Sequence, residues 1–448
     1  MSYVPHTADD RAKMLSAIGA ATVEEMFADI PEAVRLQKEL DLPLGWSEFE
    51  VRKFFRQLSS RDKVGDNAVC FAGMGSYEHF VAAAVNPLLL RPEFYTAYTP
   101  YQPEVAQGTL QCIYEFQSMM TRLTGLPVSN ASLYDGGTAL AEAIQLLRAH
   151  TKKNRVIILD GVNPLYRTVV DTIISPTNPK IVHVPLTNGV TTVASLEAVL
   201  DDDTACIVIQ QPNFVGQLED AETLIAVAKK KNIPAIVSTY PISLGLLKAP
   251  GDYGADIVVG EGQCFGPGLN GGGPYIGIFT CKKEYVRLMP GRVAGVTQDD
   301  RGQRGFVLTL QTREQHIRRE KATSNICTNQ GLMMLASLFN LAFLGKEGVK
   351  KQARLCHQKA LYLASELSKI GLKPTFSGAF FNEFVIQPVC GGDKFLESML
   401  DKGILAGVHL GLYEPSLDGK VLVAVTELRD KSELDAYVSA AKTVNIAK

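Results

Sequence analysis

The segment Val156-Ile-Ile-Leu159 starts a series of short apolar runs that decides the fold of this chain. Four more runs follow along the sequence: Ile181-Val-His-Val184, Ala205-Cys-Ile-Val-Ile209, Ala235-Ile-Val237 and Ile257-Val-Val259. Segments with helical patterns lie between them, including Ser195 to Leu200 and Glu219 to Lys231. Apolar strands that alternate with helices predict a mostly parallel sheet with helices on both faces.

The next strand is expected to run in the opposite direction. Tyr275-Ile-Gly-Ile-Phe279 is separated from the last apolar run by a glycine-rich loop at residues 266–274. A parallel connection normally contains a helix, and no helical pattern fits into this gap. We therefore expect residues 275–279 to pair antiparallel.

Helices are expected before the sheet begins. Thr22-Val-Glu-Glu25 and Ser47-Glu-Phe-Glu50 have the spacing of a capping box, in which a hydroxyl and a carboxylate satisfy the first backbone N–H groups. Apolar residues at helical spacing predict a stripe by which these helices pack: Met14, Ile18, Met26 and Ile30. Residues 1–60 are thus predicted to form a helical N-terminal region.

The pattern changes again after the sheet. Residues 331–345 (GLMMLASLFNLAFLG) form the most apolar stretch, which is shorter than the ~20 residues that span a membrane. We interpret it as a buried helix. Residues 347–370 predict a long helix, and further elements are expected at residues 380–386, 393–402, 421–425 and 432–444. These predict a large α/β domain at residues 61–345 and a small C-terminal α+β domain at residues 346–448.

Composition excludes several classes of protein. The 448 residues carry 45 basic and 47 acidic side chains, a balance that argues against nucleic acid as a partner. The N-terminus has no pattern of a secretory signal, so we expect a cytoplasmic protein without a membrane segment. Eight cysteines without a C-x-x-C pair and seven dispersed histidines give no support for a disulfide framework or a metal site.

Four longer motifs carry a family resemblance. They are Phe71-Ala-Gly-Met-Gly-Ser-Tyr77-Glu-His79, Tyr98-Thr-Pro-Tyr-Gln-Pro-Glu104, Gln311-Thr-Arg-Glu-Gln-His-Ile-Arg-Arg319 and Lys321-Ala-Thr-Ser-Asn-Ile-Cys-Thr328. Together with the opening Tyr3-Val-Pro-His-Thr7, they resemble the glycine decarboxylase P-protein of the glycine cleavage system. The resemblance covers essentially the whole chain.

This resemblance implies a fold and a set of partners. The fold is type I of the pyridoxal phosphate (PLP) enzymes, which agrees with the predicted helical region, large α/β domain and small α+β domain. The chain resembles the N-terminal half of P-proteins, which in many bacteria is a separate subunit 1 paired with a catalytic subunit 2 (beta). The family decarboxylates glycine on PLP and passes an aminomethyl group to the lipoyl arm of the H-protein.

The residues needed to hold PLP are missing from the expected positions. Gln263 stands where the catalytic half carries the Schiff-base lysine, and an amide forms no imine. Thr239 stands where a carboxylate would face the pyridine nitrogen. Asp135 would repel a phosphate in the expected cup before Gly136, so we favour a helix cap and turn there. We expect no catalytic residue and no bound cofactor in this chain, with PLP in the partner subunit.

Two segments are candidates for an interface or substrate pocket. By the family resemblance, residues 98–104 lie near the active site between the two halves, with Tyr98, Thr99, Tyr101, Gln102 and Glu104 as candidate residues. The alternative is an extended turn with buried tyrosines. Thr323, Ser324 and Asn325 supply short polar groups, either as a helix cap or exposed to the active site.

A positive cluster is the third candidate. Arg313, His316, Arg318, Arg319 and Lys321 lie on what reads as a charged helical face on a nearly neutral protein. Such a cluster binds a carboxylate or attracts an acidic partner, whereas the alternative is a solvated surface.

Three hypotheses follow. The first is a non-PLP-binding alpha subunit of the glycine-decarboxylating complex, with glycine, subunit 2 and the H-protein as partners and no activity alone. The second is an independent PLP enzyme in which Lys248 or another lysine replaces the missing one. The third is a regulatory or binding protein that retained the fold.

Overall fold

The computed structural model describes residues 5–36, 38–62, 68–95 and 98–445. It divides into two compact units, residues 1–62 and 63–448. Tyr3 and Val4 of the opening segment lie outside the described residues. The further division predicted at residue 345 stays a prediction.

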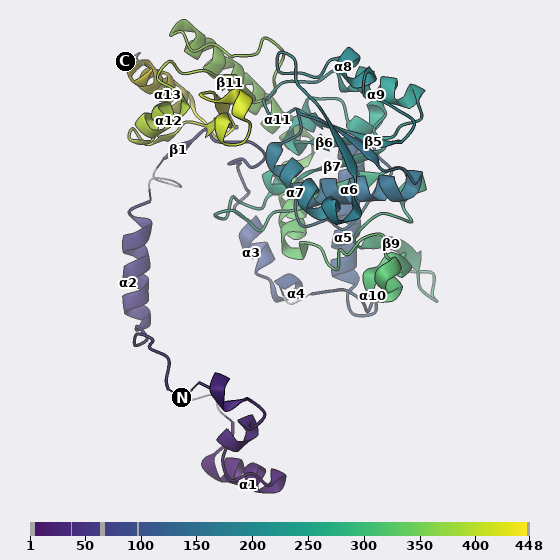
Figure 1. Ribbon diagram of the computed structural model, residues 1–448, viewed down its shortest axis with the longest axis vertical. Coiled ribbons are helices and arrows are strands. Elements are labelled where there is room, and N and C mark those ends of the chain that lie inside the picture. Colours follow the sequence, from purple (N-terminus) through teal and green to yellow (C-terminus); the bar gives the residue numbers. More distant parts are fainter. Residues whose placement is uncertain (1–4, 37, 63–67, 96–97, 446–448) are drawn as a thin grey trace. The chain divides into compact units, whose positions relative to one another are not determined.

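A seven-stranded sheet forms the centre of the second unit (Figure 1). Its strand order is β2 (Val128–Ser129), β8 (Gly277–Cys281), β7 (Ile257–Glu261), β6 (Ala235–Thr239), β5 (Thr204–Gln211), β3 (Arg155–Leu159) and β4 (Lys180–Val184). The five strands from β3 to β7 pair parallel, and β8 pairs antiparallel with both β7 and β2. The predicted parallel series and the reversed strand are both confirmed.

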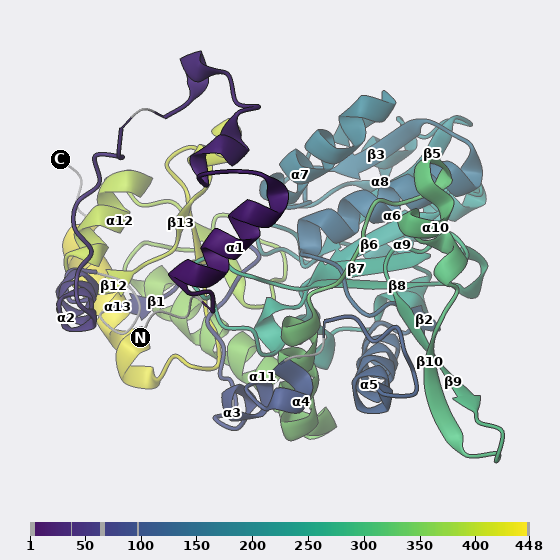
Figure 2. The same ribbon diagram turned by 90° about the horizontal axis from the view of Figure 1, so that it is seen from below.

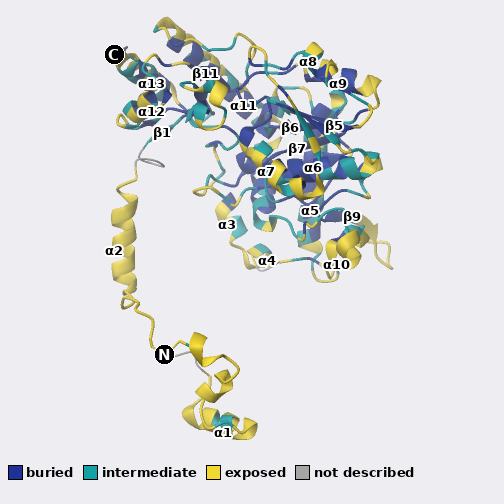
Figure 3. Cartoon of the chain, viewed as in Figure 1, coloured by how far each residue is buried: buried dark blue, intermediate teal, exposed yellow. Residues whose placement is uncertain are grey.

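Helices cover both faces of this sheet. Val156 and Ile158 of β3 pack toward α6 (Gly136–Thr151) and α7 (Pro164–Ile174). The alternate residues Ile157 and Leu159 join the cluster that contains residues of α8 (Val193–Glu197) and α9 (Ala221–Lys230). Each such side chain contributes about 1.5–3 kcal/mol when fully buried. The sheet is thus the most deeply buried part of this unit (Figure 3).

A further apolar cluster joins α5 (Gln107–Thr124) to α11 (Gly331–Lys369). By length and composition alone, α11 is apolar enough to cross a membrane. However, it carries buried side chains that include Met334, Leu335 and Leu338, as expected of a core helix. Gly345 interrupts the helix with φ 59° and ψ −177°, between the two helical segments that the sequence predicts.

The C-terminal residues form a smaller antiparallel sheet. Its strand order is β11 (Glu383–Ile386), β14 (Val421–Ala424) and β13 (Val408–His409), and α12 (Gly392–Leu400) and α13 (Lys431–Val444) accompany it. Phe384, Phe395 and Tyr437 lie in one core cluster with Phe71. Phe71 follows β1 (Val69–Cys70), which pairs parallel with β12 (Ile404–Leu405). The start of this unit is therefore built into its C-terminal core.

Shorter elements complete the second unit. They are α3 (Val85–Leu89), α4 (Pro92–Tyr95), α10 (Gln315–Arg318) and the strands β9 (Val293–Gln298) and β10 (Arg304–Thr309). The two strands form an antiparallel hairpin that extends away from the central sheet (Figure 2). The expected single charged helix at 312–321 is wrong, because three short helical turns occupy residues 311–321.

The N-terminal unit has capped helices but no core. Both α1 (Ala8–Ile18) and α2 (Glu48–Ser59) begin with a reciprocal capping box, at Thr7 and at Ser47 respectively. The Thr22 hydroxyl accepts from the Glu25 backbone N–H and the Glu25 carboxylate accepts from the Ala21 backbone N–H, but only a short 3₁₀ turn follows them. None of the described residues of this unit is buried (Figure 3). The predicted stripe is therefore exposed: Met14, Ile18, Met26 and Ile30.

Candidate functional site

The carboxyl ends of the parallel strands are the usual ligand site of an α/β sheet. Here a pocket lies at that edge, and its cavity volume is only about 20 Å³. That volume has room for about one water molecule. The lining residues are Gly75, Tyr77, Asn163, Tyr166, Gln210, Pro212, Ser238, Thr239, Tyr240, Glu261 and Glu383.

Gln263 lies beside this pocket, in the 3₁₀ turn that follows β7, and it is buried. Its Nε2 donates to the carbonyl oxygens of Tyr77 (2.9 Å) and Pro267 (3.3 Å). Its Oε1 accepts from the Tyr77 backbone N–H at 2.9 Å. The Gln263 amide thus fixes the segment around Tyr77 to the end of the sheet. Its nitrogen and oxygen are both engaged in hydrogen bonds.

Glu261 ends strand β7 and reaches the first residue of helix α6. Its Oε2 accepts from the backbone N–H of Gly136 at 2.9 Å. Its Oε1 accepts from the N–H groups of Gln263 (3.0 Å) and Ile276 (3.1 Å). Burial raises the pKa of Glu261 to about 8, although the three N–H donors oppose that shift. Sequence reasoning missed this residue, although an acid that ends an apolar strand is an unusual pattern that signals a site.

The neighbouring Asp135 caps the same helix. Its carboxylate accepts from the backbone N–H of Thr138 at 2.7 Å. The interpretation of this segment as a helix cap is confirmed. Thr239 at the end of β6 is also engaged, because its hydroxyl donates to the Gln211 carbonyl oxygen at 2.9 Å.

A second buried carboxyl group closes the other side of the pocket. Glu383 accepts from the Met74 backbone N–H (2.8 Å) and from the Tyr77 hydroxyl (2.9 Å). Burial raises the pKa of Glu383 to about 7. The partners of Glu383 are more than 300 residues away in sequence, so no local pattern indicates this contact.

Two of the three candidate segments meet on the surface around Tyr101. The Tyr101 ring lies edge-on to His316, with ring centroids 6.3 Å apart. The Arg292 guanidinium carbon lies 5.8 Å from the centre of the Tyr101 ring. Arg292 also donates to the Thr328 hydroxyl at 2.9 Å and to the Cys327 carbonyl at 3.0 Å. We call Tyr101, Arg292 and His316 the Tyr101 cluster.

The tyrosines of residues 98–104 are not buried. Tyr98 is 82% exposed and Tyr101 is 51% exposed, so the alternative of an extended turn with buried tyrosines is wrong. Gln102 and Glu104 are exposed as well, whereas the Thr99 hydroxyl is buried with no partner in the described part of the chain. Gln107, which sequence reasoning missed, donates to the Pro103 and Phe306 carbonyls at 2.7 and 2.8 Å. It holds the segment against β10.

The positive cluster is not a single patch of free cations. Arg313 donates to the backbone carbonyls of Met289, Gly291 and Leu310. Burial lowers the pKa of its guanidinium. Arg313 is thus an internal tether, whereas His316, Arg318, Arg319 and Lys321 remain exposed.

Residues 323–325 do not cap a helix, because α11 begins only at Gly331 and its cap residue is Gln330. The Ser324 hydroxyl instead accepts from the Ile326 N–H at 3.1 Å in a local turn. Thr323 and Ser324 line a small cavity together with Arg313. The cap alternative for these residues is wrong.

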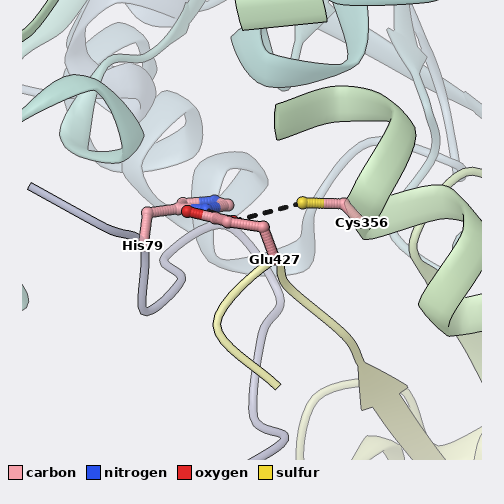
Figure 4. A group of neighbouring side chains, drawn as sticks. All are labelled: His79, Cys356 and Glu427. Atoms are coloured by element: carbon pink, nitrogen blue, oxygen red, sulfur yellow. Dashed lines mark hydrogen bonds and ion pairs between the residues drawn. The ribbon is translucent and has the colours of Figure 1, made fainter. Parts of the chain in front are cut away.

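A polar cluster lies where three segments of the chain meet (Figure 4). His79, Cys356 and Glu427 point toward one another, and their ligand-type atoms lie within 4.8 Å. Glu427 Oε2 lies 2.6 Å from His79 Nδ1 and 3.3 Å from the Cys356 sulfur, and Oε1 accepts from Gln352 (2.7 Å) and the Phe80 N–H (2.8 Å). Each carboxylate oxygen already has two partners, which describes a satisfied hydrogen-bond network.

The comparisons with known proteins agree with this architecture. The family described as glycine cleavage system P-protein matches residues 1–440. A probable glycine dehydrogenase (decarboxylating) subunit 1 from Carboxydothermus hydrogenoformans is 48% identical over 438 residues, which cover 98% of each chain. The protein of the same description from Geobacillus thermodenitrificans is 49% identical over 440 residues, again 98% of each chain.

Solved structures give the same result. An inhibitor-bound glycine decarboxylase (P-protein) of the glycine cleavage system superposes with a TM-score of 0.90 and 38% identity, covering 99% of this chain and 100% of that chain. A glutamate decarboxylase from Lactobacillus brevis shares the fold alone, with a TM-score of 0.66 and 13% identity over 94% of this chain and 98% of that chain. The fold is that of the PLP-dependent enzymes of fold type I. By sequence and by structure, this chain belongs to the glycine cleavage system P-protein family.

Proposed function

We propose that this chain is the non-PLP-binding alpha subunit of a glycine-decarboxylating complex. The names of its relatives supply the reaction and the subunit position. The observation that carries the proposal is the pocket at the carboxyl ends of the sheet strands, which the chain's own side chains fill to a residual volume of about 20 Å³.

The residues present do not fit PLP. An imine needs a lysine amine, and the buried amide of Gln263 occupies that place with its hydrogen bonds already made. A protonated pyridine needs a carboxylate, whereas the Thr239 hydroxyl is bonded to a strand carbonyl. A phosphate needs free N–H donors at a helix N-terminus, whereas Gly136 already donates to Glu261. The disagreement concerns all three parts of the cofactor.

The second subunit would therefore hold PLP and carry out the chemistry. In this proposal the complex decarboxylates glycine and transfers the aminomethyl group to the lipoyl arm of the H-protein. The chain is inactive alone because it offers neither a reactive amine nor a place for the ring. A cytoplasmic location is part of the same proposal.

The Tyr101 cluster is the part of this chain that we assign to the shared active site. It presents the Tyr101 phenol and the His316 imidazole on an exposed surface, and the buried Arg292 guanidinium lies against the Tyr101 ring. Such donors suit a substrate carboxylate or an acidic partner. Tyr98, Thr99, Gln102 and Glu104 extend this surface, and Thr323, Ser324 and Asn325 are proposed to line it. His316, Arg318 and Arg319 are proposed to contact a partner, whereas Arg313 serves as their internal anchor.

Co-expression with the second subunit tests the proposal. A tagged chain should capture that subunit, and the pair should catalyse glycine-dependent exchange of CO₂ that neither shows alone. Tyr101→Ala should lower this activity at least tenfold while capture is unchanged, because the ring forms part of the site and not of the core. Tyr413→Ala is the matched control, since Tyr413 is another partly exposed tyrosine, outside the three candidate segments.

The results also separate the other hypotheses. If capture fails and no exchange activity appears, the regulatory hypothesis is favoured. The independent-enzyme hypothesis finds no support in the pocket, because no lysine lines it within the described part of the chain. Lys248 forms an exposed ion pair with Glu222 at 2.9 Å. Activity of the purified chain without the second subunit would nevertheless restore that hypothesis.

A further inference from the structure

We propose that Glu261 plugs the position of a cofactor phosphate: its carboxyl group fills, from within the chain, the place that helix α6 offers at the end of the sheet. The inference deepens the proposed function and rests on it, because it explains how a PLP-type site is closed. Loss of the Schiff-base lysine at position 263 does not by itself close a phosphate position, because a chain without that lysine can still bind phosphate. Closing that position is the separate role that we assign to Glu261.

The geometry at the start of α6 carries this inference. The helix has 16 residues, which gives a full N-terminal partial positive charge, and its first residue is Gly136. Three backbone N–H groups converge on the Glu261 carboxyl group at 2.9 to 3.1 Å, from Gly136, Gln263 and Ile276. These donors come from three separate segments. Only the Gly136 N–H belongs to the helix N-terminus, and converging backbone N–H groups of this kind bind anions such as phosphate in other proteins.

The surroundings leave no other group for that position. Among the lining residues of the pocket there is no lysine, arginine or histidine. The positive end of α6 and the N–H donors therefore attract an anion to this place, whereas the neighbouring Asp135 carboxylate opposes one. Glu261 is 6% exposed and fills this place from within.

Tyr166 closes the space next to the carboxyl group. A Cβ atom on Gly136 would lie 2.9 Å from the Tyr166 hydroxyl oxygen and 3.1 Å from the Glu261 nitrogen. A Cβ atom on Gly75 would lie 3.2 Å from the same hydroxyl oxygen. The two glycines thus allow Tyr166 to lie where a bulky ligand group would otherwise pass. The phosphate position and its approach are both filled by the chain itself.

Removal of the carboxyl group should turn the position back into an anion site. Glu261→Ala leaves the three N–H groups without partners, so the full chain should unfold at a Tm lower by about 5 °C. Inorganic phosphate should recover at least half of that loss in the variant and leave the wild-type Tm unchanged. Formate, which replaces the missing carboxylate itself, should act in the same direction.

Glu219→Ala is the matched control. Glu219 is another buried carboxyl group that accepts a backbone N–H, from Thr191 at 2.8 Å, and a side-chain N–H from Asn213 at 2.8 Å. It ends no strand opposite a helix N-terminus, so its loss should lower the Tm without recovery by phosphate. Equal recovery of both variants, or of neither, would overturn the inference.

A measurement on the wild-type chain covers the case in which Glu261→Ala does not fold. Amide hydrogen exchange in the peptide that contains residues 132–138 should be the same with and without phosphate, because Glu261 holds the position. Slower exchange in phosphate would show an open anion site and would contradict the inference. That result leaves the proposed subunit role intact, which instead depends on capture and CO₂ exchange with the second subunit.

Discussion

At the scale of single residues, Gln263 stands at the position where the family's catalytic half carries a lysine, and its hydrogen bonds fix it in the structure. Its amide makes three hydrogen bonds, to both backbone groups of Tyr77 and to Pro267, so the position serves packing and not chemistry. Restoring the amine at this position alone leaves the pocket filled by Tyr166, Glu261 and Glu383.

Gln263→Lys should therefore form no imine with PLP. We expect no new absorbance band on addition of PLP, and no pyridoxyl adduct at residue 263 by mass spectrometry after borohydride reduction. The wild-type chain treated in the same way is the control. A reducible adduct in the variant alone would show that the pocket opens more easily than the packing indicates.

Glu427 gives a second prediction at this scale. Burial raises its pKa, but the hydrogen bond and charge of His79 together with the hydrogen bonds from Phe80 and Gln352 outweigh burial and lower the pKa to about 2. Its ionised form therefore stabilises the folded chain above about pH 4.5, and that contribution is lost as the pH falls toward about 2.

Glu427→Gln should lower the free energy of unfolding by about 2–3 kcal/mol at neutral pH. The difference from wild type should shrink in acid, as measured by urea unfolding at several pH values. Glu397→Gln, at an exposed carboxyl group of α12, is the control that should change little. A deficit that is constant with pH would assign the loss to packing instead.

At the scale of elements, the interruption of α11 depends on one glycine. Gly345 adopts φ 59° and ψ −177°, a conformation that is essentially restricted to glycine, although a Cβ atom there would meet nothing within 4 Å. Gly345→Ala should therefore lower the free energy of unfolding by about 1–3 kcal/mol through backbone strain alone. Gly331→Ala, at the open start of the same helix, should be neutral or slightly stabilising. Urea unfolding of both variants measures the contrast, and equal effects would refute it.

The elements also show what a sequence can predict. Strands β3, β5, β6 and β7 were predictable because each is an apolar run that is buried on both faces, and the edge strand β4 was predictable from its shorter apolar run although it is only partly buried. Residues 311–325 were not, because their charged spacing fits a helix while Arg313 turns inward to three carbonyl groups. The apolar stripe of the N-terminal helices was predicted to pack against other residues, but it is exposed. Helical spacing of apolar residues indicates an apolar face and does not indicate what covers that face.

The site was predictable only in part for the same physical reason. Gln263 and Thr239 follow apolar strands, so their positions could be deduced from local sequence. The contacts of Glu383 with Met74 and of Glu427 with His79 each join residues more than 300 positions apart. Such contacts depend on the order of strands in the sheet and on the path by which the C-terminal residues come back to the segment around residues 74–79. Local sequence patterns do not encode either.

At the scale of the whole molecule, the two buried carboxyl groups of the pocket make stability depend on pH. The pKa values of Glu261 and Glu383 rise from 4.5 to about 8 and about 7. Between about pH 4.5 and 8 the folded chain therefore binds more protons than the unfolded chain, and its stability falls as the pH rises.

Glu383→Gln should flatten this decline. The wild-type free energy of unfolding should decrease by up to about 3 kcal/mol from this residue between pH 5 and 8, and the variant should lack that part. Denaturant unfolding across that range measures the slope. A wild-type stability that rises with pH over the same range would contradict the assignment of raised pKa values.

The N-terminal unit has a consequence for the fate of the chain in the cell. Its described residues include no buried side chain, and exposed apolar groups such as Trp46, Phe49 and Phe55 lie along it. Segments of this kind open at almost no free-energy cost, so proteases and chaperones recognise them first. In the isolated chain, limited proteolysis should therefore begin in the N-terminal unit, before the buried sheet of the second unit is attacked.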